Sequence, residues 1–321
     1  MPPLEVPSWA WLVLALTIAG MAAIDLAMHR GSRAESRRSA LAWAGVWIGV
    51  AIAFGIAVTA WFGAPAGEQY FAAYLVEKSL SVDNLFVFIV VFEALSIPRG
   101  HQRRVLTWGI LGAFVMRGVF IALGMAVLAR WHAAVFVLGA ALVVTAVKLL
   151  RKPARGSVPR LLPWLERHLP WTRRLHGERF IARIAGRWVA TPLLVALVAI
   201  EVVDVVFAAD SLPAAFAITD EPFLIYSSNL FALLGLRSLY LVIGDALAEL
   251  RYLHVGLAGV LAFAGAKMLA SSWIVVPPLV SIGVIALVIG AAVLASIVSA
   301  RTRKPAARTP LAVIEPRRAA E

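Results

Sequence analysis

The chain has 321 residues, 61% of them hydrophobic, and a mean hydropathy of +0.86. Soluble domains use apolar residues for nearer half of their sequence, so these values exclude an ordinary soluble protein and indicate a multi-pass membrane protein. The net charge of +12 does not indicate nucleic-acid binding, because the basic residues gather in the connections between apolar segments.

Nine apolar runs approach the roughly 20 residues that a membrane-spanning helix needs. The first run is too long and too free of charge at its start to be a cleaved signal peptide. The sequence therefore predicts an all-α membrane protein with about nine transmembrane helices. In chain order the runs cover residues 8–28, 40–62, 72–96, 105–129, 132–150, 190–218, 223–248, 252–272 and 276–299.

Lysine and arginine occur in alternate connections, which predicts an orientation. They follow the first and third runs, fill the segment 151–188 and recur in the tail after residue 299. The intervening connections 63–71, 219–222 and 273–278 contain none, and Arg130 is the exception. By the positive-inside rule we expect the N-terminus outside and the C-terminus in the cytoplasm of a bacterial inner membrane. The segment 151–188 also carries tryptophans, so it is either an amphipathic stretch on the anionic inner leaflet or a solvated loop.

Carboxylates interrupt two of the apolar runs. A carboxylate near the bilayer centre costs about 2.5–3.5 kcal/mol on insertion scales, so a group of them predicts a functional site or ion pairs. Carboxylate, amide and hydroxyl oxygens suit the hard divalent cations magnesium, calcium and manganese, and the same acids can carry protons. The candidate metal-handling residues are Glu77, Asp83 and Asn84 in the third run, and Glu201, Asp204, Asp210 and Ser211 in the sixth.

The second half of the chain repeats the charged positions of the first. Aligning Asp83 with Asp210 places Glu77 over Asp204. A helix with acids, a helix with an arginine and a helix with a lysine then follow one another twice. Arg117 and Lys148 of the first half correspond to Arg237 and Lys267 of the second. Because three helices form each unit, the units have opposite orientations, which is an inverted repeat with its substrate site near the midplane. The predicted units are an N-terminal two-helix unit (1–70), a first repeat (71–150), a basic cytoplasmic loop (151–188), a second repeat (189–272) and a last helix with a basic disordered tail (273–321).

The rise of a helix places most of these acids at mid-membrane. A helix that starts near residue 72 carries Asp83 roughly 16 Å deep, and one that starts at Pro192 carries Asp204 about 18 Å deep. Asp210 comes out at about 27 Å, so we expect either a shifted start or a helix break, which Pro213 favours.

The basic residues within the runs have two interpretations. Arg117 and Arg237 can each hold a carboxylate in a structural ion pair, or they can take part in gating, and Lys267 belongs to the same ion-pair or gating class. The absence of cysteine excludes thiolate metal sites and disfavours soft-metal transport. No pairing of a nucleophile with a base and no cofactor loop indicates an enzyme, so we expect neither catalysis nor a permanently bound cofactor.

Four segments resemble the TerC family of integral membrane proteins, in the same order over about residues 70–270. They read EKSLSVDNLFVF (77–88), FAADSLP (207–213), SNLFALLGLRSLY (228–240) and FAGAKM (263–268). The resemblance implies a membrane protein linked to tellurite resistance, with members that export manganese, and a place among inverted-repeat exporters. It carries over Glu77, Asp83, Asn84, Asp204, Asp210 and Ser211 as metal-handling positions. Ala209 stands where the family more often has valine.

These observations favour an exporter of manganese or a related divalent cation, working by alternating access and coupled to protons. One rival is a membrane scaffold or stress-resistance factor without transport, in which the acids and arginines form buried ion pairs. Another handles an oxyanion such as tellurite through Arg117 and Arg237. The expected partners are the lipid bilayer and the divalent ion, with no nucleic acid, and a homo-oligomer is compatible with the sequence.

Overall fold

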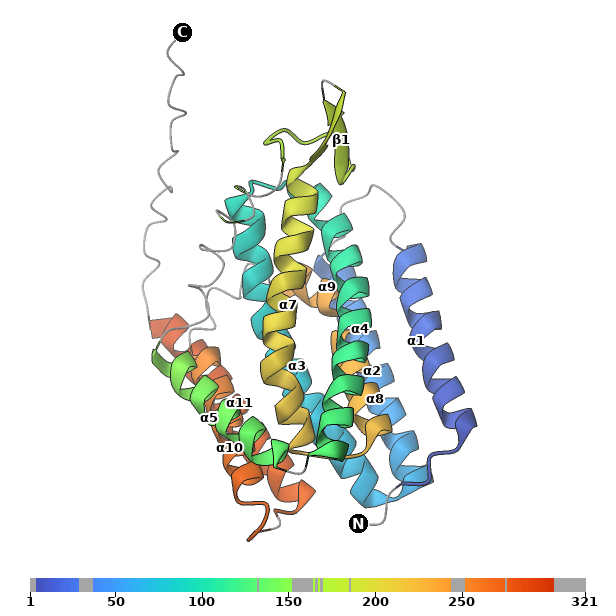
Figure 1. Cartoon of the computed structure of the whole chain (residues 1–321), viewed down its shortest axis with the longest axis vertical. Helices are drawn as coiled ribbons and strands as arrows, with labels where there is room; N and C mark the ends of the chain where they lie inside the picture. Colours follow the sequence, from blue (N-terminus) through green and yellow to red (C-terminus); the bar gives the residue numbers. More distant parts are fainter. Residues whose placement is uncertain are drawn as a thin grey trace.

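The computed structural model describes residues 4–28, 37–131, 133–151, 164, 167, 170–184, 186–243, 252–274 and 276–302. Within these ranges the chain forms ten helices and one β-hairpin (Figure 1). The elements are α1 (Ser8–Met28), α2 (Arg37–Phe62), α3 (Ala64–Ala94), α4 (Arg99–Arg130), α5 (Ala134–Arg151), β1 (Ile181–Ile184), β2 (Arg187–Ala190), α7 (Pro192–Phe216), α8 (Pro222–Leu233), α9 (Leu236–Ile243), α10 (Leu253–Leu269) and α11 (Pro278–Thr302).

The prediction of an all-α membrane protein is confirmed. Six of the described helical segments are long and apolar enough to cross a membrane, and two shorter apolar helices cover Ser8–Met21 and Leu253–Leu269. On α4, Leu111, Val115, Val119 and Leu123 recur every four residues and are each about half exposed. Residues at this spacing share one helix face, so this apolar stripe is the surface that α4 turns toward lipid.

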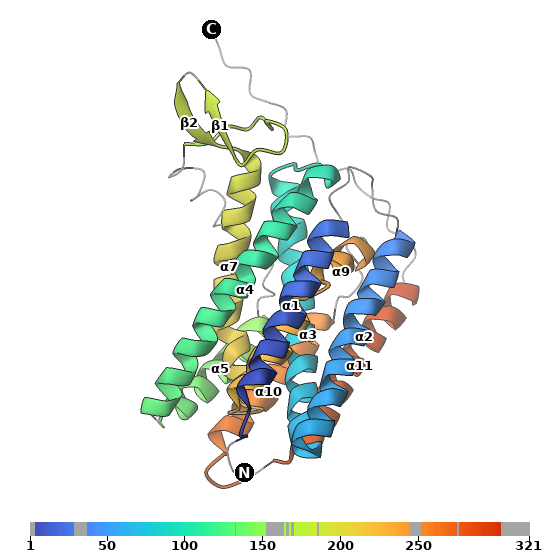
Figure 2. The same cartoon turned by 90° about the vertical axis from the view of Figure 1, so that its right-hand side faces the viewer.

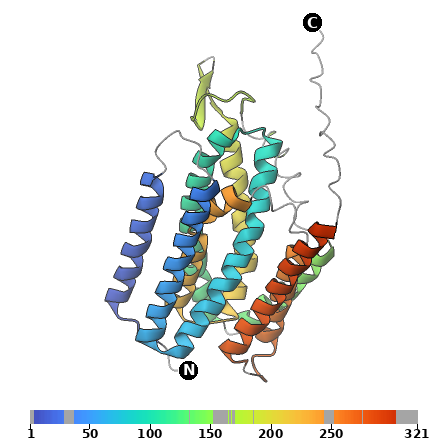
Figure 3. The same cartoon turned by 180° about the vertical axis from the view of Figure 1, so that it is seen from behind.

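Two central helices organise the bundle. α3 packs against α2, α7 and α8, while α7 also packs against α4. α5, α10 and α11 form a group on one side of them, and α11 also packs against α3 (Figures 1 and 3). α5 and α10 cross closely at Gly139 and Gly265, where a Cβ added to Gly265 would lie 2.7 Å from the Gly139 carbonyl oxygen. Small residues at a crossing let two membrane helices approach closely.

The third predicted run starts too late. α3 begins at Ala64 rather than near residue 72, so Glu77 lies 13 residues, or about 20 Å, into the helix. Gly63, with φ 89°, and Pro65 in the first turn define this start. Glu68 and Gln69 lower the local hydropathy, but they do not interrupt the helix.

The helix break occurs in a different span from the one predicted. α7 is continuous from Pro192 to Phe216 and includes Pro213. The interrupted span is the next one, where α8 ends and α9 begins around Gly235, whose φ is 77°. Glycine tolerates this left-handed conformation, whereas a proline removes one hydrogen bond but leaves the rest of a well-packed helix intact.

The described part of the basic segment is a short hairpin at one end of the bundle (Figure 2). β1 and β2 are antiparallel, with Ile181 opposite Ala190, and the hairpin leads directly into α7. Its outer face is apolar and basic, because Trp188 is 68% exposed and Arg183 lies over the Trp188 ring. Residues 152–163 and the tail after residue 302 lie outside the described residues, so their predicted character stays a prediction.

Candidate functional site

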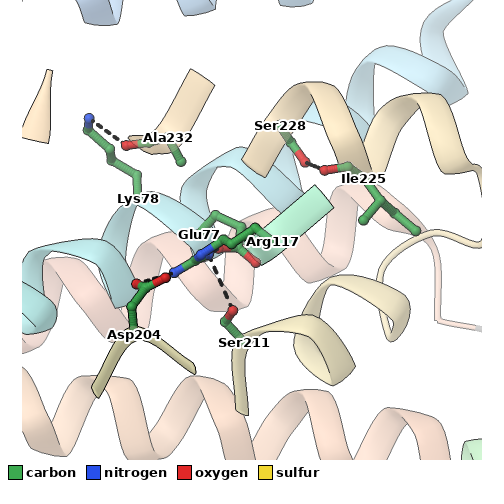
Figure 4. A network of polar contacts seen from close by, with 8 residues as sticks. All are labelled: Glu77, Lys78, Arg117, Asp204, Ser211, Ile225, Ser228 and Ala232. Atoms are coloured by element: carbon green, nitrogen blue, oxygen red, sulfur yellow. Dashed lines mark hydrogen bonds and ion pairs between the residues drawn. The ribbon is translucent and has the colours of Figure 1, made fainter. Parts of the chain in front are cut away.

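A buried guanidinium joins the two acidic helices. The Nη1 atom of Arg117, on α4, donates to Glu77 Oε2 on α3 at 2.6 Å, and Nη2 lies 3.5 Å from Asp204 Oδ1 on α7. Nη1 also lies 3.4 Å from Ser211 Oγ on α7 (Figure 4). Glu77 and Arg117 have no exposed side-chain surface. Because charges in a membrane core need partners, this bridge accounts for their burial.

Several buried polar groups around this bridge form no hydrogen bond with it. Among the described residues, Glu77 Oε1 and the Ser81 hydroxyl are buried and have no hydrogen-bond partner. Ser81 follows Glu77 by one helical turn, so the two side chains share a face of α3. Asn229 on α8 is also fully buried, and its amide faces the Glu77 carboxylate without reaching the distance and angles of a well-formed hydrogen bond. Buried polar atoms of this kind usually have a partner, so each of these atoms can receive a ligand or a water molecule.

Glu201 occupies a different environment from Asp204, although only three residues separate them on α7. Its carboxylate lies against α4, where a Cβ added to Gly112 would come within 2.6 Å of Glu201 Cδ. Gly109, one turn earlier, widens the same notch. The missing side chains of two glycines therefore provide the space that Glu201 fills.

The broken span binds a cation that belongs to α3. Lys78, on α3 beside Glu77, donates from Nζ to the carbonyl oxygen of Ala232 at 3.1 Å (Figure 4). It also donates to the carbonyl oxygen of Leu234 at 3.1 Å. These carbonyls lie at the C-terminal end of α8, where the helix dipole favours positive charge. Lys78 therefore ties α3 to the break between α8 and α9.

The structure brings together only some of the predicted site residues. Glu77, Asp204, Ser211 and Arg117 meet in one cluster, and Glu201 lies one turn away. Arg237 is buried on α9, and Lys267 lies on α10, where its Nζ is 3.2 Å from Ser281 Oγ. The side chains of Asp83, Asn84 and Asp210 lie outside the described part of the structure, so their predicted roles stay predictions. Within the described part, no three acidic or histidine side chains form a group that could hold a metal ion.

Sequence reasoning missed Asn229 and the contact that Lys78 makes. Both residues lie in polar segments within apolar runs, and this position was the feature that could have marked them as site residues. Their roles depend on how α8 packs against α3, and a single sequence does not show this packing.

A cavity of about 910 Å³ opens at the end of the bundle opposite the hairpin. It lies between the start of α3, the end of α7 and the group α5, α10 and α11. Thr219 donates to Gln69 Oε1 at 2.6 Å in its wall, and Asp220, Glu221 and Lys267 also line it.

Comparison with known proteins finds a family model and several relatives. The model described as "Integral membrane protein TerC family" matches residues 62–304. An uncharacterised membrane protein of Myxococcus xanthus is 42% identical over 298 residues, which cover 91% of this chain and 92% of that protein. The Escherichia coli K12 protein named "Putative membrane-bound redox modulator Alx" is 38% identical over 290 residues, covering 86% of this chain and 90% of that protein.

A plant relative is also similar. The chloroplastic "Thylakoid membrane protein TERC" of Arabidopsis thaliana is 39% identical over 267 residues, which cover 82% of this chain and 70% of that protein. No solved structure matches the chain.

Proposed function

Because this chain belongs to the TerC family of integral membrane proteins, we propose that it exports manganese or a related divalent cation by alternating access, in exchange for protons. The observation that carries this proposal is the bridge of Glu77, Arg117 and Asp204. Two carboxylates share one guanidinium, so these three groups have a net charge of −2 + 1 = −1 in the bundle core. A cation would offset this negative charge, whereas an oxyanion would add to it.

The buried oxygens beside the bridge supply suitable ligands for such a cation. Glu77 Oε1, Ser81 Oγ and the Asn229 amide oxygen are hard donors, which magnesium, calcium and manganese prefer. Asp83 and Asp210 are further acids on the same two helices, and we propose them as the residues that complete the shell. The three metals are not distinguished by this donor set.

The packing of the helices supports the inverted repeat. In the proposed repeat, α3 corresponds to α7, α4 to the broken α8–α9 span, and α5 to α10. A two-fold axis that relates the two units would then exchange the pair α3–α8 with the pair α7–α4. Both pairs are in contact, and α5 contacts its counterpart α10. An inverted repeat would produce this exchange, and we propose that its axis passes close to the bridge of Glu77 and Asp204.

The cavity opposite the hairpin is the proposed exit. Gln69 in its wall precedes Glu77 by eight residues, or about 12 Å of helix. Between them lies an apolar layer that includes Ala73 and Val76 of α3 and Ala214 of α7. We propose that this layer closes the site toward the outside and separates when the two repeats rock against each other.

Transport is tested with purified protein in liposomes. We expect manganese flux across a pH gradient for the wild type, and loss of most of that flux for Asp204→Asn, Asp83→Asn and Asp210→Asn. Glu178→Gln is the control, because Glu178 is exposed on the segment that precedes the hairpin. Among the described contacts, its ion-pair partner is Arg104. Equal flux in all variants, or wild-type flux no greater than that of protein-free liposomes, would refute the proposal.

Displacing Glu201 without touching a charge is a more selective test. A methyl group at Gly112 collides with the flexible end of the Glu201 side chain, so Gly112→Ala is expected to move the carboxylate while the helices stay packed. We expect the apparent affinity for Mn²⁺ in the flux assay to fall roughly tenfold, the loss typical when a group that supports a metal site is displaced. Gly118→Ala is the matched control on α4, because its added Cβ meets open space. Equal affinities would remove Glu201 from the site.

A membrane scaffold without transport is the second candidate, and the bridge itself favours it, because Arg117 already gives both described carboxylates a partner. The name of the Escherichia coli relative suggests a redox role for that protein. This chain has no cysteine, so it offers no thiol for disulfide exchange. A scaffold predicts no metal flux in liposomes and proteins that co-purify with the chain.

A further inference from the structure

A second cavity, of about 220 Å³, lies at the hairpin end of the bundle and is separate from the proposed cation path. It is formed by the end of α3, the first two turns of α4 and the short helix α9. Among the described residues, Arg99, Arg103 and Arg237 line it together with the acid Glu93. Basic side chains therefore outnumber acidic ones among the described lining residues, which favours an anion over a divalent cation.

The walls of this basic pocket are held in place. Tyr240 donates to Gln102 Oε1 at 2.8 Å, and Gln102 Nε2 donates to the Ile97 carbonyl oxygen at 2.8 Å. The Tyr240 ring packs edge-on against Phe92. Arg237 is 2% exposed, so its guanidinium has little freedom to leave the pocket. Arginines with fixed geometry recognise the oxygens of phosphate groups better than mobile surface lysines do.

The start of α4 adds to this positive field. The helix has 32 residues, and neither an acidic residue in its first turn nor a side-chain cap is present among the described contacts. The N-terminal end of such a helix attracts anions. The dipole and the arginines therefore act on the same small volume.

We propose that the basic pocket binds a phosphate group, supplied either by the headgroup of an anionic phospholipid or by a free phosphate. By the proposed orientation the pocket faces the cytoplasmic leaflet, where anionic lipid headgroups lie. Bound phosphate bridges the arginines of α4 and α9, and so stabilises one arrangement of the two repeats. The inference does not depend on cation export, because it concerns a different cavity and a different charge.

Thermal unfolding of the full chain tests this inference without added divalent metal. In detergent we compare inorganic phosphate with sodium chloride of equal ionic strength, and in nanodiscs we compare phosphatidylglycerol with phosphatidylcholine. We expect Tm of the wild type to rise by roughly 2 °C or more with phosphate, with phosphatidylglycerol or with both. A rise in the nanodiscs alone identifies the lipid headgroup, and a rise in detergent shows that free phosphate is sufficient.

The variants decide whether the pocket is responsible. Arg103→Gln and Arg99→Gln, both at positions with solvent-accessible surface, are each expected to remove most of the rise. Arg104→Gln is the matched control, because Arg104 has the same charge on the same turn but pairs with Glu178 outside the pocket. The inference is overturned if neither comparison stabilises the wild type, or if the rise survives in both pocket variants.

Discussion

Arg117→Gln is expected to lower the free energy of unfolding by about 3–5 kcal/mol, the usual cost of removing one partner from a buried ion pair. Arg117 has no exposed side-chain surface and contacts acids on both α3 and α7, so its loss leaves two carboxylates without their shared cation. Unfolding in mixed detergent micelles measures this change. Arg117→Lys is expected to recover little of it, because one ammonium group cannot reproduce the fork that spans Glu77 and Asp204.

A double variant separates charge from packing. In Glu77→Gln/Arg117→Gln the remaining carboxylate gives the three groups a net charge of −1, the same as in the wild type. We expect this double variant to be more stable than Arg117→Gln alone. If both variants are equally unstable, the guanidinium acts through packing and hydrogen bonds rather than through its charge.

Added metal distinguishes the proposed function from a purely structural bridge. Without Arg117, the two carboxylates carry a charge of −2, which a divalent ion can neutralise. If the bridge overlaps the cation site, Mn²⁺ is expected to raise Tm of Arg117→Gln more than it raises Tm of the wild type. A scaffold whose acids never bind metal predicts the same small response from both proteins.

The sequence predicted the membrane class well, because apolar length alone sets that class. Every predicted apolar run overlaps a described helix, and the run 223–248 overlaps both α8 and α9. The starts of helices were harder to predict. α3 extends eight residues before the predicted start, because a helix end depends on Gly63 and Pro65 rather than on where hydropathy falls.

The residue types of the site could be predicted from the sequence, but the contacts between its side chains could not. Alignment of the two halves paired Glu77 with Asp204, and the structure places both on Arg117. The sequence could not show that one arginine serves both acids, because that contact requires α3, α4 and α7 to meet. It also favoured a break near Asp210, whereas the chain breaks at Gly235 and α7 continues through Pro213. The inverted repeat, the nine spans and their orientation stay predictions.

Lys78→Met is the second substitution for which we expect a large effect. The ammonium group of Lys78 binds two backbone carbonyls at the end of α8, and hydrogen bonds to charged groups contribute about 1.5–3 kcal/mol each. Methionine has a side chain of similar length to that of lysine, but it donates no hydrogen bond. We expect a loss of roughly 2–4 kcal/mol in the free energy of unfolding, because part of the cost of burying the ammonium is recovered. Lys148→Met is the control, since Lys148 is exposed on α5.

The consequence of Lys78→Met for transport follows from its position next to Glu77. One turn of α3 holds both the bridge and the contact to the break, so movement of α8 relative to α3 changes the two together. Discontinuous helices commonly line the sites of transporters built from inverted repeats. We therefore expect Lys78→Met to lose flux even under conditions where it remains folded, and Lys78→Arg to recover part of it because a guanidinium can reach the same carbonyls. If Lys78→Met transports as the wild type does when folded, the break between α8 and α9 is not coupled to the site through α3.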